Sequence, residues 1–304
     1  MKPFPFSAAE GIMKKWAKNN VGFFFIIPWL IGFLVFKLYP FGSSLIYSFT
    51  DFHLFKGIST TGIMNYLDVF QKPKNLEALK LTFKYAFMTV PLKLVISLFI
   101  AYILNFKLKG VNFFRTAYYI PSILGGSVAI SVLWRALFKD DGLIQQMIRM
   151  LGGNPPSFMT DPNWALFIIC LLRVWQFGST MVIFLAALKN VPEDLYEAAS
   201  IDGARKWKQF FSITVPLITP VIFYNLITQL VQAFQEFNGP FIITNGGPRG
   251  KTTLMSILIY NAAFKSYDMG LASAMAWVLF IILVFFTAIS FWSQKHWVYY
   301  ADED

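Results

Sequence analysis

The dominant pattern along the chain is a succession of long apolar runs separated by short polar stretches. The first run begins at Val21, continues past Pro40 and ends at about Phe49. Further runs follow at about 81–104, 114–138, 164–188, 209–234 and 271–293. A helix of about 20 apolar residues crosses the hydrocarbon core of a bilayer. The pattern therefore predicts an all-α integral membrane protein, with six transmembrane helices in one domain at 21–293.

The two ends of the chain are polar and are expected on the same side of the membrane. Residues 1–20 carry several lysines, but the apolar run that follows is long and has no small-residue cleavage pattern, so a cleaved signal is not expected. Lys and Arg accumulate in cytoplasmic loops. They are modestly enriched in one alternate set of polar stretches, at 1–20, 105–113, 189–208 and 294–304. We therefore expect a cytoplasmic N-terminal segment at 1–20 and a cytoplasmic tail at 294–304.

Composition supports a membrane protein and excludes several other classes. Of the 304 residues 56% are hydrophobic and 14% are charged, whereas soluble domains reach about 25% charged. The net charge of +10 comes from residues scattered between apolar runs, without a basic face for nucleic acid. Cys170 cannot form an intrachain disulfide, and His53 and His296 lie too far apart for a metal site. No catalytic constellation or phosphate-binding loop is present, so this chain is not expected to hydrolyse ATP.

One charged stretch, 192–220, is tightly bounded by two apolar runs and reads PEDLYEAASIDGARKWKQFFSITVPLITP. Acidic residues fill the first turn after Pro192, which favours a helix N-terminus. Asp202 and Gly203 predict a turn, and a second short helix is expected from near Ala204. The stretch therefore predicts a helix, a glycine elbow and another helix at the membrane surface.

This segment resembles the EAA loop in the permease subunits of bacterial ABC importers. The loop has E-A-A, two residues, D-G-A, and then a Phe, an Ile and two prolines at fixed distances, matched here by Glu197, Ala198, Ala199, Asp202, Gly203, Ala204, Phe210, Ile213, Pro216 and Pro220. In that family the loop forms coupling helices that dock on a cytoplasmic ATPase. The resemblance implies an ATPase-coupling role for the first six of these residues; an ordinary interfacial loop is the alternative.

Polar side chains inside the apolar runs form the candidate substrate site, because such residues commonly face a cavity or a partner. The fifth run carries amides and one acid at helical spacing: Asn225, Gln229, Gln232, Gln235, Glu236 and Asn238. The fourth run adds Trp175, Gln176, Phe177, Ser179 and Thr180. Amides and aromatic rings suit a neutral polyhydroxylated ligand, although the amides could instead bridge neighbouring helices. Arg173 requires a partner, for which Glu236 is conceivable.

Three further expectations concern residues outside this set. Lys84 and Lys93 are expected to extend toward a membrane surface. The outer stretch 139–163 reads as a solvated connector. The outer segment beginning TNGGP at Thr244 is similar to a T-x-G-G-P signature of carbohydrate permeases of the maltose-type and glycerol-phosphate-type subgroup. By position, the sugar-contacting stretches of that subgroup fall on 175–180 and 235–238.

The resemblance implies a type I ABC importer permease fold and a sugar-importing permease subunit. It also implies a second permease subunit, a cytoplasmic ATPase dimer that carries ATP and Mg, and an extracytoplasmic solute-binding protein, with no cofactor on this chain. The maltose-type subunit has two extra N-terminal spans and a large periplasmic insert that this sequence lacks, so its docking to a binding protein does not carry over. Two alternatives are a permease for another solute and a stand-alone secondary transporter.

Overall fold

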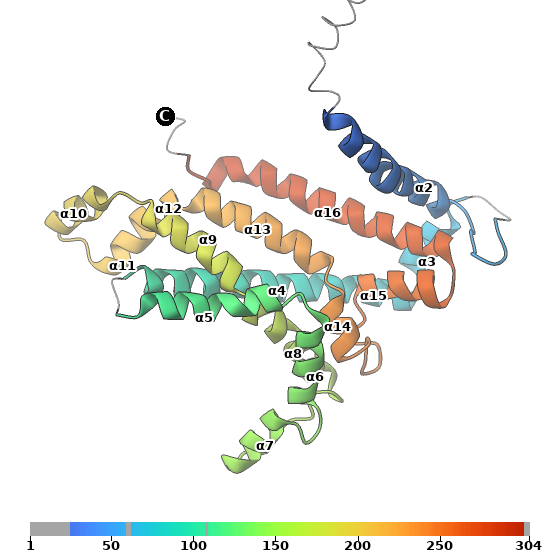
Figure 1. Cartoon of the computed structure of the whole chain (residues 1–304), viewed down its shortest axis with the longest axis horizontal. Helices are drawn as coiled ribbons and strands as arrows, with labels where there is room; N and C mark the ends of the chain where they lie inside the picture. The colour runs from blue at the N-terminus through green and yellow to red at the C-terminus, as the bar shows by residue number, and fades with distance from the viewer. Residues whose placement is uncertain (1–24, 59–61, 107–108, 301–304) are drawn as a thin grey trace, which may run out of the picture.

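The computed structural model describes residues 25–58, 62–106 and 109–300, and the regular structure within them is helical, without strands. The predicted segment 1–20 and residues 301–304 lie outside the described residues. The molecule is elongated (Figure 1). One end carries α10 (Glu193–Ile201) and α11 (Lys206–Gln209), and the other carries α3 (Met64–Gln71).

Within the described residues, all six predicted apolar runs are helical, but only three of them form unbroken helices. The unbroken helices are Phe25–Ser48, α4 (Pro73–Asn105) and α16 (Met269–Trp297). The first includes η1 (Leu34–Leu38) and α2 (Tyr39–Ser48). By length and composition each can cross a membrane, and the total is six if each bent pair of helices forms one span.

The other three runs are broken by sharp bends. The bends are 101° between Val111–Leu124 and Val128–Met150, 42° between Pro162–Trp175 and Gly178–Lys189, and 67° between Lys206–Leu217 and Thr219–Ile243. The elements concerned are α5 (Val111–Leu124), α6 (Val128–Phe138), α8 (Pro162–Trp175), α9 (Gly178–Lys189), η2 (Phe210–Thr214), α12 (Val215–Leu217), α13 (Thr219–Phe234) and α14 (Asn238–Ile243). The spans predicted at 114–138, 164–188 and 209–234 are therefore each a bent pair of helices, which the pattern of apolar residues did not indicate.

Local sequence accounts for two of the breaks. Between α5 and α6 stand Gly125 and Gly126, followed by Ser127, whose Oγ accepts the Ile130 N–H at 3.3 Å as a helix cap. Between α12 and α13, Pro216 and Pro220 remove two backbone donors around Ile218. These residues end one helix and start the next in a new direction.

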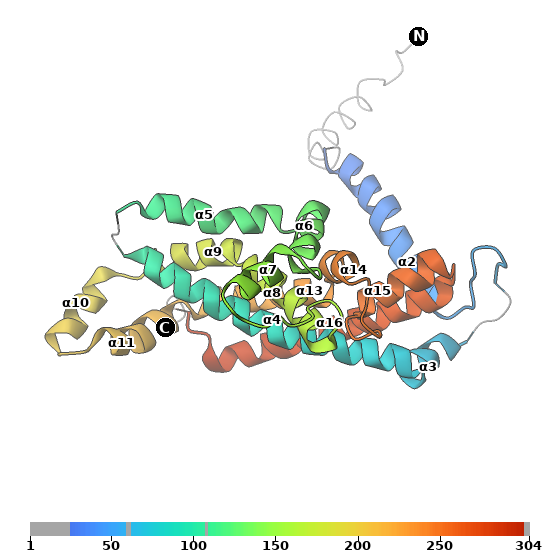
Figure 2. The same ribbon diagram turned by 90° about the horizontal axis from the view of Figure 1, so that it is seen from below.

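Helix α4 is the central element, since it packs against α8, α9 and α13 (Figure 2). Tyr85 of α4 and Phe234 of α13 are buried in the main hydrophobic cluster, and Met181 and Phe184 of α9 in a second one. Thr82 of α4 accepts the backbone N–H of Met255 at 2.9 Å, which fixes the start of α15 (Met255–Tyr260). The π-helical turn η3 (Asn261–Lys265) follows it.

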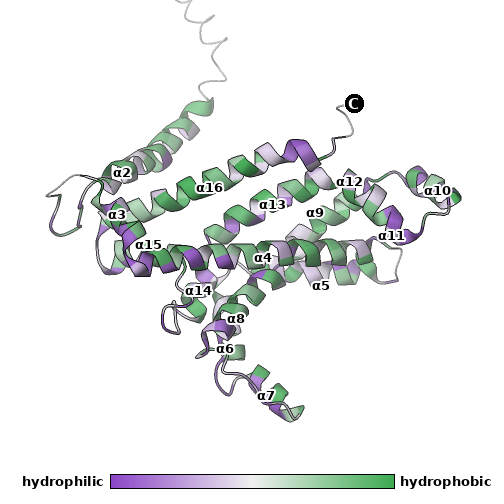
Figure 3. Cartoon of the chain, turned by 180° about the vertical axis from the view of Figure 1, so that it is seen from behind, coloured by the Kyte–Doolittle hydropathy of each residue, from purple (hydrophilic) through white to green (hydrophobic). Residues whose placement is uncertain are grey.

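The outer surface of the long helices is apolar. Figure 3 shows hydrophobic residues along α2 and α16, with hydrophilic residues gathered near α11 and α3. In the helix Phe25–Ser48, none of the residues in the most apolar stretch is buried within this chain. Phe25 and Phe36 of this helix are 81% and 77% exposed. A soluble protein does not present so large a continuous apolar surface, and lipid or a partner membrane subunit would cover it.

Three local predictions require correction. The stretch 139–163 is not a plain connector: it contains α7 (Leu143–Met150), and Gln145 of α7 is buried against Pro156. Lys93 does not reach a surface, because neighbouring helices cover it and leave 3% of the residue exposed. The second short helix of the EAA-like segment starts at Lys206 rather than near Ala204.

The segment between α5 and α6 is hydrogen-bonded to the segment between α8 and α9. Gln176 Nε2 donates to the Gly125 carbonyl at 2.9 Å. Ser122 Oγ donates to the Gln176 carbonyl at 3.2 Å and accepts the Ser179 N–H at 2.8 Å. Backbone groups that leave the helical ladder at one break thereby find partners at the other.

Glycine at position 178 is required for this contact, which yields the first prediction. A Cβ there would lie 2.2 Å from the Tyr118 carbonyl oxygen and 2.8 Å from the Tyr119 Cα, both backbone atoms. We expect Gly178→Ala to destabilise the purified protein by about 1–3 kcal/mol, the usual cost of overpacking. The measurement is the thermal unfolding midpoint in detergent. Gly126→Ala, where nothing lies within 4 Å of the added Cβ, is the matched control; equal midpoints for both variants would contradict the assigned contact.

Candidate functional site

The EAA-like segment, 192–220, forms the expected pair of short helices at one end of the molecule. Helix α10 begins after Pro192 with Glu193 and Asp194 in its first turn, where the acidic side chains complement the helix dipole. Gly203 has a φ of +75°, in the left-handed region that glycine adopts readily. It reverses the chain so that α11 starts at Lys206.

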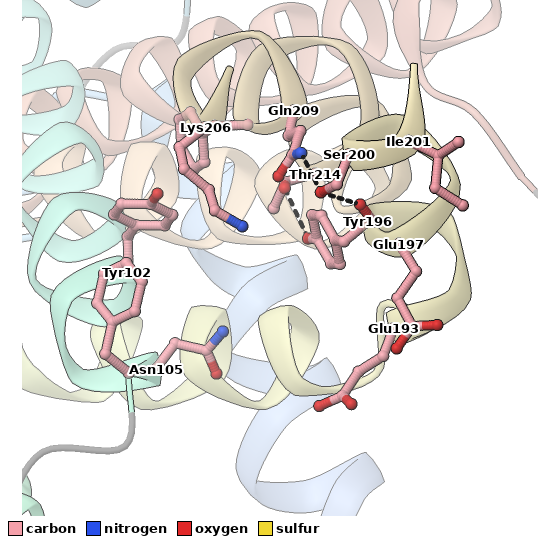
Figure 4. Close-up of a pocket in the computed structure, with 12 residues that line it drawn as sticks. Tyr102, Asn105, Glu193, Tyr196, Glu197, Ser200, Ile201, Lys206, Gln209 and Thr214 are labelled. Atoms are coloured by element: carbon pink, nitrogen blue, oxygen red, sulfur yellow. Dashed lines mark hydrogen bonds between the residues drawn. The ribbon is translucent and has the colours of Figure 1, made fainter. Parts of the chain in front are cut away.

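Hydrogen bonds between side chains brace this segment internally (Figure 4). The Tyr196 hydroxyl and Thr214 Oγ1 lie 2.7 Å apart and connect α10 to η2. Gln209 is 3% exposed, and its Nε2 donates to Ser200 Oγ at 2.9 Å. The same Nε2 also donates to the Ala204 carbonyl at 3.0 Å. The two helices and the start of the following span are therefore held together as one unit.

The predicted coupling residues lie on the outside of this unit. Glu197, Ala198, Asp202 and Gly203 are exposed, while Ala199 and Ala204 are half-buried. Ile201 and Trp207 are 88% and 72% exposed among them, and a Cβ on Gly203 would meet nothing within 4 Å. Exposed apolar anchors with charged neighbours are the composition of a protein-docking surface.

The inner side of the same unit lines a pocket of about 560 Å³ that is open to solvent (Figure 4). It lies between the C-terminal end of α4 and the two short helices, with Tyr102 and Asn105 opposite Tyr196 and Glu197. Tyr102 packs edge-on against Phe210 with 4.7 Å between ring centroids. Aromatic packing therefore connects the segment to α4.

A second group of polar residues surrounds what we call the open depression, a hollow of about 300 Å³ between α8 and the end of α13. Its lining residues are Arg173, Gln232, Gln235, Glu236, Phe237 and Asn238. An Arg173 Nη donates to Gln232 Oε1 at 2.6 Å, and the other Nη lies 3.6 Å from Glu236 Oε2. The predicted pairing of Arg173 with Glu236 is thus confirmed, and four predicted substrate residues line one hollow.

The other predicted substrate residues lie elsewhere. Gln176, Thr180, Asn225 and Gln229 are buried inside this chain, where Gln229 Nε2 donates to Thr180 Oγ1 at 3.1 Å. Trp175 packs against Trp134 with 5.5 Å between ring centroids, Phe177 against Tyr118 with 5.8 Å, and Ser179 is exposed beside the docked breaks. The polar stripe of the fifth span is real, but α4 and α9 cover its first half, and only its last half faces the open depression.

Sequence reasoning missed Lys93 as a buried polar residue of the helix bundle. Lys93 lies on α4 in a buried polar stripe with Thr82, Thr89 and Ser97. Residues 82, 89, 93 and 97 are separated by seven, four and four positions, which places them on one helix face. This spacing could have indicated from the sequence that Lys93 shares a helix face with other polar residues. In the structure that face is covered by neighbouring helices.

The outer segment after α14 folds into a compact loop. Thr244 Oγ1 and Thr252 Oγ1 lie 2.7 Å apart, and Thr253 Oγ1 donates to the Gly246 carbonyl at 3.0 Å. Gly246 has a φ of +82°. Among residues 25–58, 62–106 and 109–300, no group of three or more His, Cys, Asp or Glu side chains is arranged to hold a metal ion.

Comparison with characterised proteins finds relatives that extend over nearly the whole chain. The permease protein YesP of Bacillus subtilis, described as a probable ABC transporter permease, is 44% identical over 290 residues, 94% of each chain. The lactose transport system permease protein LacF of Rhizobium radiobacter is 33% identical and covers 95% of this chain and 98% of its own. The trehalose/maltose permease protein MalF of Thermococcus litoralis is 32% identical over 90% of this chain and 94% of its own.

The fold is similarly matched by a solved structure. A chain in the crystal structure of a bacterial alginate ABC transporter, in complex with alginate pentasaccharide-bound periplasmic protein, superposes with a TM-score of 0.79. It covers 92% of this chain and 96% of its own at 21% identity. The helical arrangement is thus similar to that of a chain in an ABC transporter.

The model of one protein family matches residues 57–298, which include α4, all three broken spans and both candidate sites. Together with the relatives above, this match identifies the chain as a multi-pass membrane permease without catalytic activity of its own. The chain belongs to the family of inner membrane components of binding-protein-dependent transport systems.

Proposed function

We propose that this chain is one permease subunit of a bacterial ABC importer for a sugar or oligosaccharide. The names of its relatives, which include lactose and trehalose/maltose permeases, support a carbohydrate. The open depression also suits a carbohydrate, because amide groups and an aromatic ring line it. Most of the predicted substrate residues that are not buried lie there.

A single observation carries the proposal: a braced, exposed helix pair and a polar depression occupy one continuous structural unit. The EAA-like segment runs directly through η2 and α12 into α13, and the C-terminal end of α13 carries Gln232 and Glu236. A cytoplasmic ATPase docked on Glu197 to Ala204 would therefore act on the span that lines the solute path. ATP and Mg would bind to that ATPase, not to this chain.

The remaining partners follow from the shape of the molecule. The depression is open on one side, so we infer that a second permease subunit closes it and completes the solute path. An extracytoplasmic binding protein would deliver the solute at the end that carries α3 and the TNGGP loop. In this arrangement the protein would lie in the bacterial cytoplasmic membrane with both chain termini in the cytoplasm, an orientation that the distribution of Lys and Arg supports.

In this mechanism the permease alternates between two orientations of one central site. Closure of the ATPase dimer would displace α10 and α11 as a rigid body, because Gln209 and Tyr196 connect them. The displacement would rock α13 and α9 and turn the open depression from the cytoplasm toward the outside.

The composition of the native complex gives the second prediction. When the tagged chain is extracted gently from its native membrane, we expect a second permease and an ATPase to accompany it, as identified by mass spectrometry. Uptake by the reconstituted complex should follow ATP and not the proton gradient. Repeated recovery of this chain alone, still competent in uptake, would contradict the importer assignment.

Coupling can be tested at Gly203, which gives the third prediction. Gly203→Arg introduces bulk where the ATPase would dock, although the chain itself has space there. We expect the variant to reach the membrane, while transport and ATPase binding fall at least tenfold. Gly57→Arg is the matched control, since Gly57 has a φ of +77° and the same open surroundings but lies in an outer loop. Normal ATP-driven transport by Gly203→Arg would show that this surface does not couple.

A further inference from the structure

A hollow of about 340 Å³ lies between the first turns of α4 and the start of α8, and three lysines line it. Lys80 and Lys84 belong to α4, and Lys251 belongs to the loop after α14. Helix α4 starts beside α3 and runs toward α10 and α11 (Figure 2). The hollow therefore lies on the side of the molecule remote from the EAA-like segment.

Two of these lysines have no partner in the part of the chain that the structure describes. The Lys251 ammonium group is paired with the carboxylate of Glu77, which also lines the hollow. Lys80 and Lys84 are exposed and make no hydrogen bond or ion pair with any described residue. They stand four positions apart on one helix face, with about 6 Å between their Cβ atoms. Two ammonium groups so placed suit one anion with several oxygens, such as a phosphate.

The face of α4 that carries Lys84 continues toward the other end of the helix as an exposed apolar stripe. We call this set the α4 stripe: Phe87, Met88, Leu92, Val95, Phe99 and Ile103. From Lys84 to Ile103 the chain advances 19 positions, or about 28 Å of helix. The hydrocarbon core of a bilayer is about 30 Å thick. Lys84 therefore lies at the level where hydrocarbon gives way to lipid headgroups.

The composition of the α4 stripe favours lipid over a partner helix as its cover. Nine positions, or 2.5 turns, separate Lys84 from the buried Lys93, so the stripe faces away from the bundle. Interfaces between membrane helices are enriched in small residues, whereas the stripe consists of large ones. The open depression, which a second permease is proposed to close, is lined by no residue of α4.

The start of α8 marks the same depth independently. Trp164 is 40% exposed in the first turn of α8, next to Asn163, which lines the hollow. Tryptophan is enriched at the level of the headgroups. The neighbouring acid, Asp161, caps α8 by accepting the N–H groups of Asn163 and Trp164 at 2.8 and 3.1 Å, and it forms no ion pair with the two lysines.

We propose that this hollow binds one anionic phospholipid, whose phosphate group is held by Lys80 and Lys84. The acyl chains of this lipid lie along the α4 stripe. Lys251, held in place by Glu77, adds a further cation beside the headgroup. The lipid belongs to the leaflet remote from the EAA-like segment, and its binding is independent of the solute that the proposed importer carries.

The test is native mass spectrometry of the full chain, purified in detergent with the subunits that accompany it. The probes are phosphatidylglycerol, which is anionic, and the zwitterionic phosphatidylcholine with the same two oleoyl chains. We expect one phosphatidylglycerol to bind about tenfold more tightly than phosphatidylcholine, since each lysine near an anionic lipid adds affinity. Joint replacement by Lys80→Gln and Lys84→Gln should reduce this preference to less than about twofold. Joint replacement by Lys80→Arg and Lys84→Arg should retain it, because the charges remain.

The matched control is the pair Lys56→Gln and Lys74→Gln. It removes two exposed cations near the same end of the chain's first spans, outside the hollow, and should leave the preference for phosphatidylglycerol unchanged. This control separates the hollow from a general attraction of anionic lipid to lysines. Equal thermal unfolding midpoints without added lipid check that both double variants are folded.

Three results would overturn the lipid site. The first is equal affinity for both lipids, which would also be found if an acidic surface of another subunit covered the lysines. The second is an unchanged preference in the Lys80→Gln and Lys84→Gln variant. The third is displacement of the bound lipid by inorganic phosphate at constant ionic strength, which indicates a site for a soluble anion. Lipid binding is measured without transport, so the importer function stands or fails separately.

Discussion

The packing of the broken helices depends on one contact, in which two interrupted helices satisfy each other's backbone groups. A helix that breaks at membrane depth leaves N–H and C=O groups without partners, and lipid supplies none. Here the side chain of Gln176 binds the Gly125 carbonyl, while Ser122 bridges the Gln176 carbonyl and the Ser179 N–H. The approach is close because position 178 has no Cβ.

A further interruption, between the end of α13 and the start of α14, uses the same principle. Glu236 accepts the N–H of Gly239 at the start of α14, and its own carbonyl accepts the Ser256 hydroxyl at 2.5 Å. This contact holds a carboxylate beside Arg173 in a place where an unpaired acid would be costly. Broken helices thus allow polar and charged groups to gather at membrane depth, which an uninterrupted bundle of apolar helices does not.

The proposed coupling segment and the open depression are connected by covalent continuity rather than by a chain of side-chain contacts. The unit formed by α10, α11 and η2 is internally hydrogen-bonded, and α12 and α13 continue from it toward Glu236. The 67° bend at Ile218 lies between the two ends. In the proposed mechanism, a rigid-body displacement of the short helices would act on α13 through this bend.

The sequence by itself determined the class of the protein, the number of apolar runs and the helix, elbow and helix of 192–220. These depend on local properties, namely hydropathy, proline and glycine positions and the spacing of a long motif. The partnership of Arg173 with Glu236 was also accessible, because a buried charge requires a counter-charge.

What the tertiary structure decided is which face of each helix is covered. Periodicity placed Asn225 and Gln229 on the same stripe as Gln232 and Glu236, yet α4 and α9 bury the first pair and leave the second open. The burial of Lys93 was decided in the same way, since a helix pattern states which residues share a face but not which neighbour packs against it.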